Sequence, residues 1–106
     1  MIKEKIITFG EHLRALRETA GLTLRQVASC ISIDTSLLAK IERNERPPTK
    51  QLITQIANFY NIDTRVLLEE FLSDQIAYKI LDEEAYLNIL KVAEKKVSYL
   101  KTIRNG

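Results

Sequence analysis

Apolar residues recur along most of this chain at the three- and four-residue spacing of an amphipathic helix, not at the alternate spacing of a strand. This spacing predicts helices over residues 9–20, 24–31, 35–43 and 50–60. A fifth helix is expected to begin after Asp63 and to run toward Ile80 with a kink or break, and a last one to begin at Asp82. The predicted fold class is therefore all-α.

Residues that cap helix ends support these boundaries. Thr8 is followed three residues later by Glu11, and Thr23 by Gln26, so each pair fits a capping box in which two side chains satisfy free backbone N–H groups. Asp34 is a good N-cap for the third helix. The starts of the first three helices are thus marked by residue types as well as by periodicity.

The composition fits one compact helical core with an appendage. The chain has 106 residues, is 45% hydrophobic, and contains three glycines and two prolines. Its net charge of +2 is too small to indicate a nucleic-acid partner, so the distribution of charge has to carry that argument. Cys30 is the only cysteine, which excludes an intramolecular disulfide, and we expect it to be a small packing residue.

The sequence lacks the patterns that enzymes use. There is no phosphate loop, catalytic triad or metal-ligand spacing, and the only histidine, His12, is expected on an exposed helix side without a catalytic partner. We therefore expect no enzymatic activity, no cofactor and no metal. Charged residues at positions 3–5 do not fit a signal peptide, and no apolar run is long enough for a membrane span, so a cytoplasmic protein without a membrane partner is expected.

The helix predicted over 35–43 has two different faces. One face carries Leu37, Leu38 and Ile41. The opposite face carries Thr35, Ser36, Ala39, Lys40 and Arg43. A helix that enters the DNA major groove needs such a face, because short side chains allow close approach and longer basic ones reach guanine or phosphate.

The segment FGEHLRALRETAGLTLRQVASCISIDTSLLAKIERNERPP resembles the Cro/CI/Xre family of helix-turn-helix DNA-binding proteins, over about residues 8–68. The resemblance implies a five-helix, lambda-repressor-like domain over residues 1–70 whose third helix reads double-stranded DNA. It implies base contacts by Thr35, Ser36, Ala39 and Lys40. It implies backbone contacts, or a basic environment for them, from Thr23, Arg25, Arg43, Asn44, Arg46 and Lys50. It also implies a partly buried structural ion pair between Arg17 and Glu42.

Three positions depart from the family pattern. Leu24 stands where a DNA-contacting glutamine is frequent, and Ser32 and Asn44 stand where glycine is usual. Asn44 is a mild change because asparagine tolerates positive φ, whereas Leu24 leaves base contacts to the third helix. A narrower resemblance links the chain to regulators encoded beside restriction-modification genes.

Residues 71–106 form a predicted C-terminal helical extension. Its last helix carries an apolar stripe of Tyr86, Ile89, Leu90, Ala93, Val97 and Leu100. An isolated amphipathic helix is marginal in water, so the stripe packs either on its own chain or on a second subunit, and the second subunit is favoured. A homodimer would hold two recognition helices about 34 Å apart and would bind a pseudo-palindromic operator.

The sequence therefore predicts a sequence-specific DNA-binding transcriptional regulator, dimeric and repressing by occupying promoter DNA. The direction of control rests on the habit of the family. One alternative is an antitoxin that represses its own operon, which a disordered tail would favour, whereas this tail is predicted to be helical. The other is a protein-interaction adaptor with the same fold, favoured by Leu24 and by the low net charge. Tyr86 and Tyr99 are expected in a core or interface, so no small-molecule effector is expected.

Overall fold

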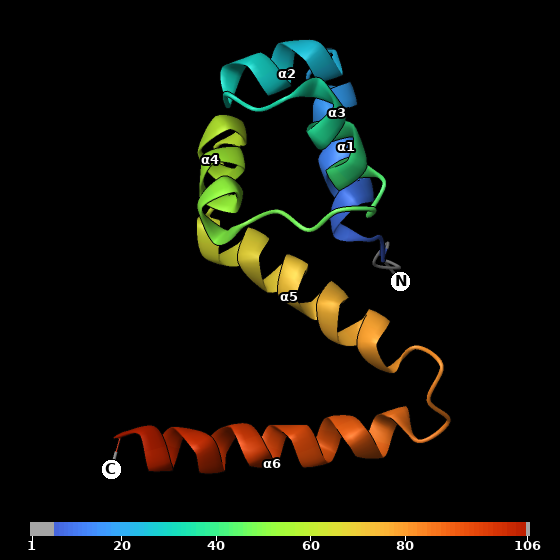
Figure 1. The fold of residues 1–106 in the computed structure, drawn as a ribbon, viewed down its shortest axis with the longest axis vertical. Helices are drawn as coiled ribbons and strands as arrows, with labels where there is room; N and C mark the ends of the chain where they lie inside the picture. Colours follow the sequence, from blue (N-terminus) through green and yellow to red (C-terminus); the bar gives the residue numbers. More distant parts are fainter. Residues whose placement is uncertain (1–5, 106) are drawn as a thin grey trace, which may run out of the picture. The chain divides into compact units, whose positions relative to one another are not determined.

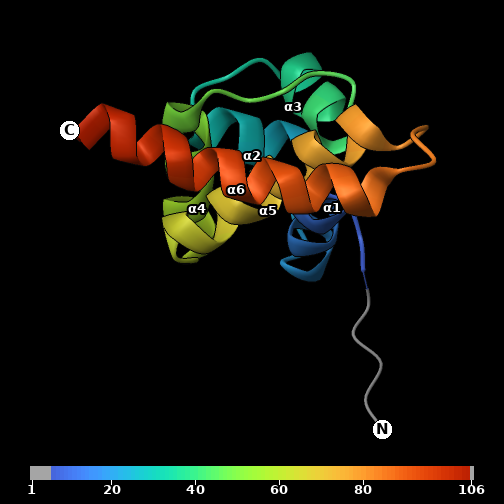
Figure 2. The same ribbon diagram turned by 90° about the horizontal axis from the view of Figure 1, so that it is seen from below.

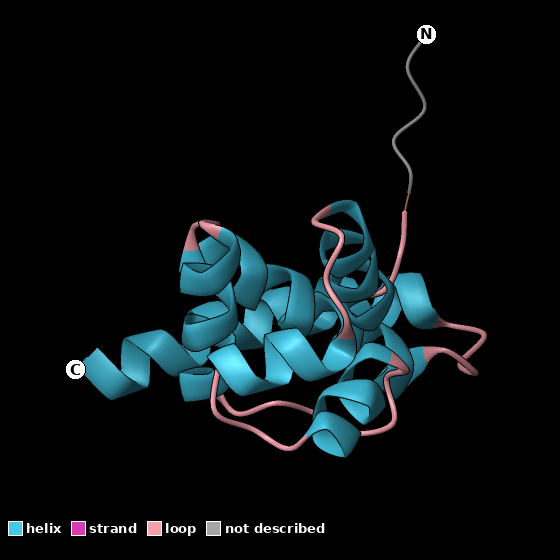
Figure 3. Cartoon of the chain, turned by 90° about the horizontal axis from the view of Figure 1, so that it is seen from above, coloured by secondary structure: helices cyan, strands magenta, loops and turns pink. Residues whose placement is uncertain are grey.

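The structure, a computed structural model, describes residues 6–105, so the expectation about residues 3–5 lies outside it. All regular secondary structure in this range is helical and no strand occurs there, which confirms the all-α fold class (Figures 1 and 3). The helices are α1 (Phe9–Thr19), α2 (Leu24–Cys30), α3 (Thr35–Glu42), α4 (Lys50–Tyr60), α5 (Thr64–Ile80) and α6 (Tyr86–Asn105). No helix within 6–105 is long and apolar enough to cross a membrane.

Both predicted capping boxes are present. The Thr8 hydroxyl accepts a hydrogen bond from the Glu11 N–H at 3.2 Å, and the Glu11 carboxylate accepts one from the Thr8 N–H at 2.9 Å. Thr23 and Gln26 make the equivalent pair of bonds at the start of α2. Asp34 takes the predicted N-cap position of α3, but its side chain makes no capping hydrogen bond. The predicted position of the cap is therefore confirmed, and the predicted capping bond is not present.

Four helices end in the same way, through one residue in the left-handed conformation. These residues are Gly21, Ser32, Asn44 and Asn61, with φ values of 69°, 58°, 62° and 57°. After each of them the next N–H bonds to a carbonyl five residues back, as in Ile33 to Ala28 and Glu45 to Lys40, which is the Schellman pattern. The prediction for Asn44 is confirmed. Ser32 holds a left-handed conformation without being glycine, at a cost of about 1–2 kcal/mol.

The core of the N-terminal unit combines apolar residues from five helices. Its buried members are Phe9, Leu13, Val27, Ala28, Ile31, Leu38, Ile41, Leu52, Ile53, Ile56, Ala57 and Leu67. Helix α3 contacts both α1 and α2. A short helix such as α3 is marginal alone, so its position is set by these tertiary contacts.

Three contacts fasten α5 to α1. The Phe9 N–H, left free at the start of α1, donates to Asp74 Oδ2 at 2.6 Å, and the Phe9 ring packs edge-on against Phe71 with centroids 5.3 Å apart. His12 Nδ1 lies 2.7 Å from a Glu70 carboxylate oxygen. The expectation that His12 lies on an exposed helix side was therefore wrong: His12 is half-buried, because Glu70 of α5 lies against it.

The chain forms two compact units that meet between Asp74 and Gln75, inside α5. In the second unit, an irregular loop over residues 81–85 joins α5 to α6 (Figure 2). The last helix begins at Tyr86 and not at Asp82 as expected. The Glu83 N–H bonds to the Ile80 carbonyl at 2.9 Å, so the chain turns before α6 can start.

Candidate nucleic-acid interface

The turn between α2 and α3 is held by its own backbone. Ser32 and Ile33 donate to the carbonyls of Ser29 and Ala28 at 3.3 and 3.0 Å, which closes the end of α2 and aims the chain into α3. The buried Val27 belongs to the same core as Leu38, so the two helices also share apolar packing. The orientation of α3 against α2 is therefore fixed by both hydrogen bonds and core contacts.

The two faces predicted for α3 have different exposure. Leu38 and Ile41 are 2% and 1% exposed, whereas Thr35, Ser36 and Lys40 are exposed. Ala39 is half-buried. These four small or basic residues lie on the side of α3 away from Leu38 and Ile41; we name Thr35, Ser36, Ala39 and Lys40 the outer face of α3.

Basic and polar residues flank this outer face in the sequence, and they are exposed. They are Thr23, Arg25, Arg43, Asn44, Arg46 and Lys50. Arg25, Arg46 and Lys50 form no ion pair with any residue in the range 6–105. Cations without an acidic partner are free to bind phosphate, and each such contact adds salt-dependent affinity.

Arg43 differs from these residues because it has an acidic partner. Its Nε lies 2.7 Å from a Glu45 carboxylate oxygen. The hydrogen bond that Arg43 donates to Glu45 raises the pKa of Arg43, and the same bond lowers the pKa of the Glu45 carboxyl. A phosphate bound by Arg43 would therefore have to compete with Glu45.

Asn44 has a structural role that the sequence analysis did not foresee. Its Oδ1 accepts from the Gly10 N–H at 3.0 Å, and its Nδ2 donates to the Thr8 hydroxyl at 2.8 Å. A Cβ on Gly10 would lie 2.5 Å from both Asn44 Oδ1 and the Glu42 carbonyl oxygen. Gly10 therefore permits α1 to approach the end of α3. One glycine in a helix did not by itself signal this contact.

Arg17 and Glu42 form a two-pronged ion pair between α1 and α3. Arg17 Nε lies 2.9 Å from one Glu42 oxygen and Arg17 Nη2 lies 3.0 Å from the other, while Nη1 donates to the Leu22 carbonyl at 3.1 Å. The side chains are only 13% and 5% exposed. The hydrogen bond to Glu42 raises the pKa of Arg17. This pair fixes the last residue of α3 against α1.

The charges of the same ion pair affect the pKa of Tyr60, the last residue of α4. Burial raises the pKa of Tyr60 to about 12; the charge of Glu42 adds to this rise and that of Arg17 opposes it. The ring also packs edge-on against Phe59, with centroids 4.9 Å apart. The ion pair therefore lies close enough to α4 to change the pKa of Tyr60.

Cys30 is exposed, so the expectation of a packing residue was wrong. Val27, Ala28 and Ile31 fill the buried side of this segment, and Cys30 points away from it. Within residues 6–105, no three histidine, cysteine or acidic side chains come together to hold a metal ion.

Residues 8–71 match a family described as a helix-turn-helix domain. The chain belongs to this helix-turn-helix family. The match confirms the family inferred from the sequence; the link to restriction-modification genes stays a prediction. Helix α6 lies outside the matched residues of the helix-turn-helix protein.

The helix-turn-helix chain is similar to three curated proteins. The regulator DdrOP3 of Deinococcus deserti is 36% identical over 63% of this chain and 54% of its own length. ImmR of Bacillus subtilis is 31% identical over 58% of this chain and 49% of its own length. YazB of the same organism is 35% identical over 51% of this chain and 78% of its own length. The chain thus spans about half the length of the first two relatives.

Proposed function

We propose that this protein is a sequence-specific DNA-binding regulator of transcription that acts as a dimer and represses by occupying promoter DNA. Membership of the helix-turn-helix family supports DNA binding. The names of DdrOP3 and ImmR, both called HTH-type transcriptional regulators, support a role in transcription. A cytoplasmic site of action and a kinship with regulators encoded beside restriction-modification genes belong to the same proposal.

The observation that carries the proposal is the outer face of α3, on which Thr35, Ser36 and Lys40 are exposed. Thr35 and Ser36 lie at the start of the helix, where short side chains let the backbone approach base edges. Lys40 lies one turn further and is long enough to reach a guanine or a phosphate. The Arg17–Glu42 pair and the core side of α3 hold this face in place.

Backbone contacts are assigned to exposed residues around α3. Exposure supports phosphate contacts by Thr23, Arg25, Arg46 and Lys50. Arg43 would join them by giving up its ion pair with Glu45 for a phosphate. The Asn44 side chain is occupied by α1, so Asn44 contributes by fixing the loop after α3.

Two variants separate base reading from phosphate binding in the full-length protein. Binding sites are first selected from a random duplex library at near-physiological salt, and the enriched motif is then measured with Lys40→Ala, Arg46→Ala and the matched control Lys91→Ala. Arg46→Ala should weaken binding to all sequences and reduce the salt dependence by about one ion. Lys40→Ala should relax the preference at one base pair by about 1–3 kcal/mol.

Enrichment of an inverted repeat supports a dimeric regulator, and a half-site alone supports DNA reading without the dimer. If the folded protein enriches no motif and binds only weakly and in a salt-sensitive way, specific reading is wrong. A protein-interaction role would then explain the family match.

A further inference from the structure

Helix α6 exposes a wide apolar surface. None of its residues is buried, although it spans 20 residues. Its large exposed apolar side chains are Tyr86, Leu87, Leu90, Val92, Val97, Tyr99, Leu100 and Ile103. Exposed apolar surface on a long helix needs a partner, because helices in water depend on packing of their apolar side.

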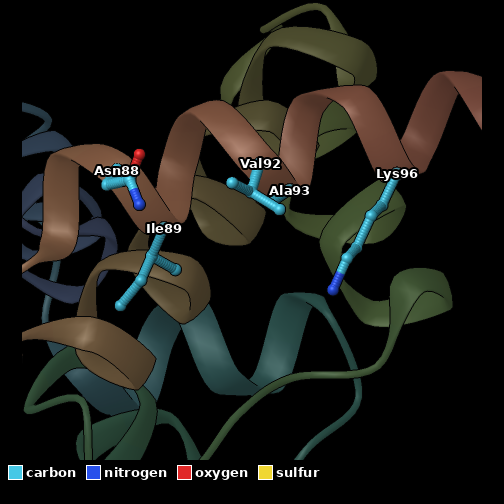
Figure 4. A pocket seen from close by; sticks show the side chains of 5 residues that line it. All are labelled: Asn88, Ile89, Val92, Ala93 and Lys96. Carbon is cyan, nitrogen blue, oxygen red and sulfur yellow. The ribbon is translucent and has the colours of Figure 1, made fainter.

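Part of the apolar surface of α6 follows a heptad repeat, and Leu90 and Val97 lie beside it at the e positions. Counting Tyr86 as position a, the a and d positions are Tyr86, Ile89, Ala93, Lys96, Leu100 and Ile103. All but Lys96 are apolar, and Ala93 is the smallest. Figure 4 shows that Ile89, Ala93 and Lys96 line a hollow on α6 together with Asn88 and Val92. The middle of the stripe thus combines a gap at Ala93 with a long basic side chain one turn away.

The two ends of α6 carry opposite charge. Asp82, Glu83 and Glu84 lie just before its first residue. Lys101 and Arg104 lie in its last turns, and Arg104 is in the last one. A helix with one acidic and one basic end is electrostatically complementary to a copy of itself running in the opposite direction.

We propose that α6 pairs with α6 of a second copy in antiparallel orientation. This inference rests on the proposed dimer and gives it an interface and a direction. An antiparallel pair brings each acidic end against the partner's basic end, whereas a parallel pair brings acidic ends together and basic ends together. The arrangement is two-fold symmetric, so the same apolar surface of α6 forms the interface in both subunits.

The heptad supports the same direction. In an antiparallel pair, a positions meet d positions, so Tyr86 packs on the partner's Ile103 and Ile89 packs on the partner's Leu100. Ala93 then meets the partner's Lys96, whose aliphatic stem fills the gap while its ammonium reaches water. In a parallel pair, Lys96 would face the partner's Lys96 inside the seam, where two like charges repel each other.

A competing explanation of the charges is the helix dipole. Acidic residues near the N-terminus and basic residues near the C-terminus stabilise a single helix without any partner. A useful test must therefore change pairing and dipole interactions in opposite directions.

Charge reversal achieves this separation. Lys101→Glu with Arg104→Glu makes both ends acidic and should weaken self-association of the full chain by about tenfold at low salt. Adding Glu83→Lys and Glu84→Lys swaps the two ends, which restores antiparallel complementarity and should return the dissociation constant to within about threefold of the parent. Sedimentation equilibrium without DNA measures both. A dissociation constant that is unchanged in the double variant would overturn the antiparallel pair. If the quadruple variant associates more weakly than the double variant, the charges serve the helix dipole instead.

Cysteine cross-linking reads the direction itself. In a Cys30→Ser background, Tyr86→Cys and Ile103→Cys variants are oxidised separately and after mixing. Antiparallel pairing predicts a disulfide dimer only in the mixture, whereas parallel pairing predicts one in each separate variant. No cross-link in any sample, with a monomer in sedimentation, overturns self-pairing.

These readouts contain no DNA, so they are independent of the proposed function. A monomer that still selects a DNA motif would overturn only the pairing of α6. An antiparallel dimer that selects no motif would overturn the regulator and leave the pairing intact.

Discussion

Helices α3 and α6 have similar apolar periodicity but opposite surroundings. In α3, which has eight residues, Leu38 and Ile41 are almost fully buried against neighbouring helices. In α6, which has 20 residues, Leu100 and Ile103 are more than half exposed. The shorter helix, which could not persist alone, therefore has the better-defined environment. An apolar stripe shows that a helix needs a partner, but it does not show whether the same chain supplies that partner.

The largest contrast is expected from one substitution made in each helix. Leu38→Ala should lower the free energy of unfolding by about 2–5 kcal/mol, because it removes a buried side chain and leaves a cavity. Leu100→Ala should change the stability of the monomer by less than about 0.5 kcal/mol. Urea unfolding at low protein concentration measures both, and sedimentation should show weaker self-association for Leu100→Ala alone. Equal losses of monomer stability would contradict the contrast.

Removing one charge sharpens the same comparison. Glu42→Gln should cost about 3 kcal/mol, because the nearly buried Arg17 would lose its ionised partner. The matched variant Glu94→Gln, at an exposed position of α6, should change the unfolding free energy by less than about 0.5 kcal/mol. Urea midpoints of the two variants test this difference. A small effect of Glu42→Gln would mean that the pair orients α3 without stabilising it.

Alkaline pH should act on the packed region through Tyr60. Its pKa is raised from 10.0 to about 12, so the folded state holds the phenol proton more tightly than the unfolded state. The associated stability is complete below about pH 10 and is lost as pH rises to about 12. Tyr60→Phe should make the stability less dependent on pH in this range. Urea unfolding from about pH 9 to about pH 12, a range that covers both pKa values of Tyr60, measures this. An unchanged curve would place the alkaline transition elsewhere.

The smallest effect is expected at a turn. Ser32→Gly should stabilise the protein by about 1 kcal/mol, because Ser32 adopts φ 58° without the freedom of glycine. Asn44→Gly is its counterpart at φ 62° but should destabilise, since it removes two hydrogen bonds to α1. Thermal unfolding of both variants tests this reversal of sign. Stabilisation by both would mean that the Asn44 bonds add little.

Local chemistry made several elements predictable. Thr8 and Thr23 marked two helix starts because each capping box depends only on residues three apart. Asn44 marked a helix end because its backbone tolerates positive φ. The position of Cys30 was mispredicted, and so was the start of α6, because both depend on which side of a segment meets the core and on how a loop turns. Base and phosphate contacts stay predictions.

The sequence by itself determined the helical class, the family and the two chemically different faces of α3, since periodicity, caps and motifs are properties of neighbouring residues. Only the tertiary structure decided that Asp74 caps α1, that Glu70 meets His12 and that Gly10 admits Asn44. These contacts join residues from 34 to 65 positions apart. Their hydrogen bonds require the core to hold α1, α3 and α5 together, so no pattern of neighbouring residues could predict them.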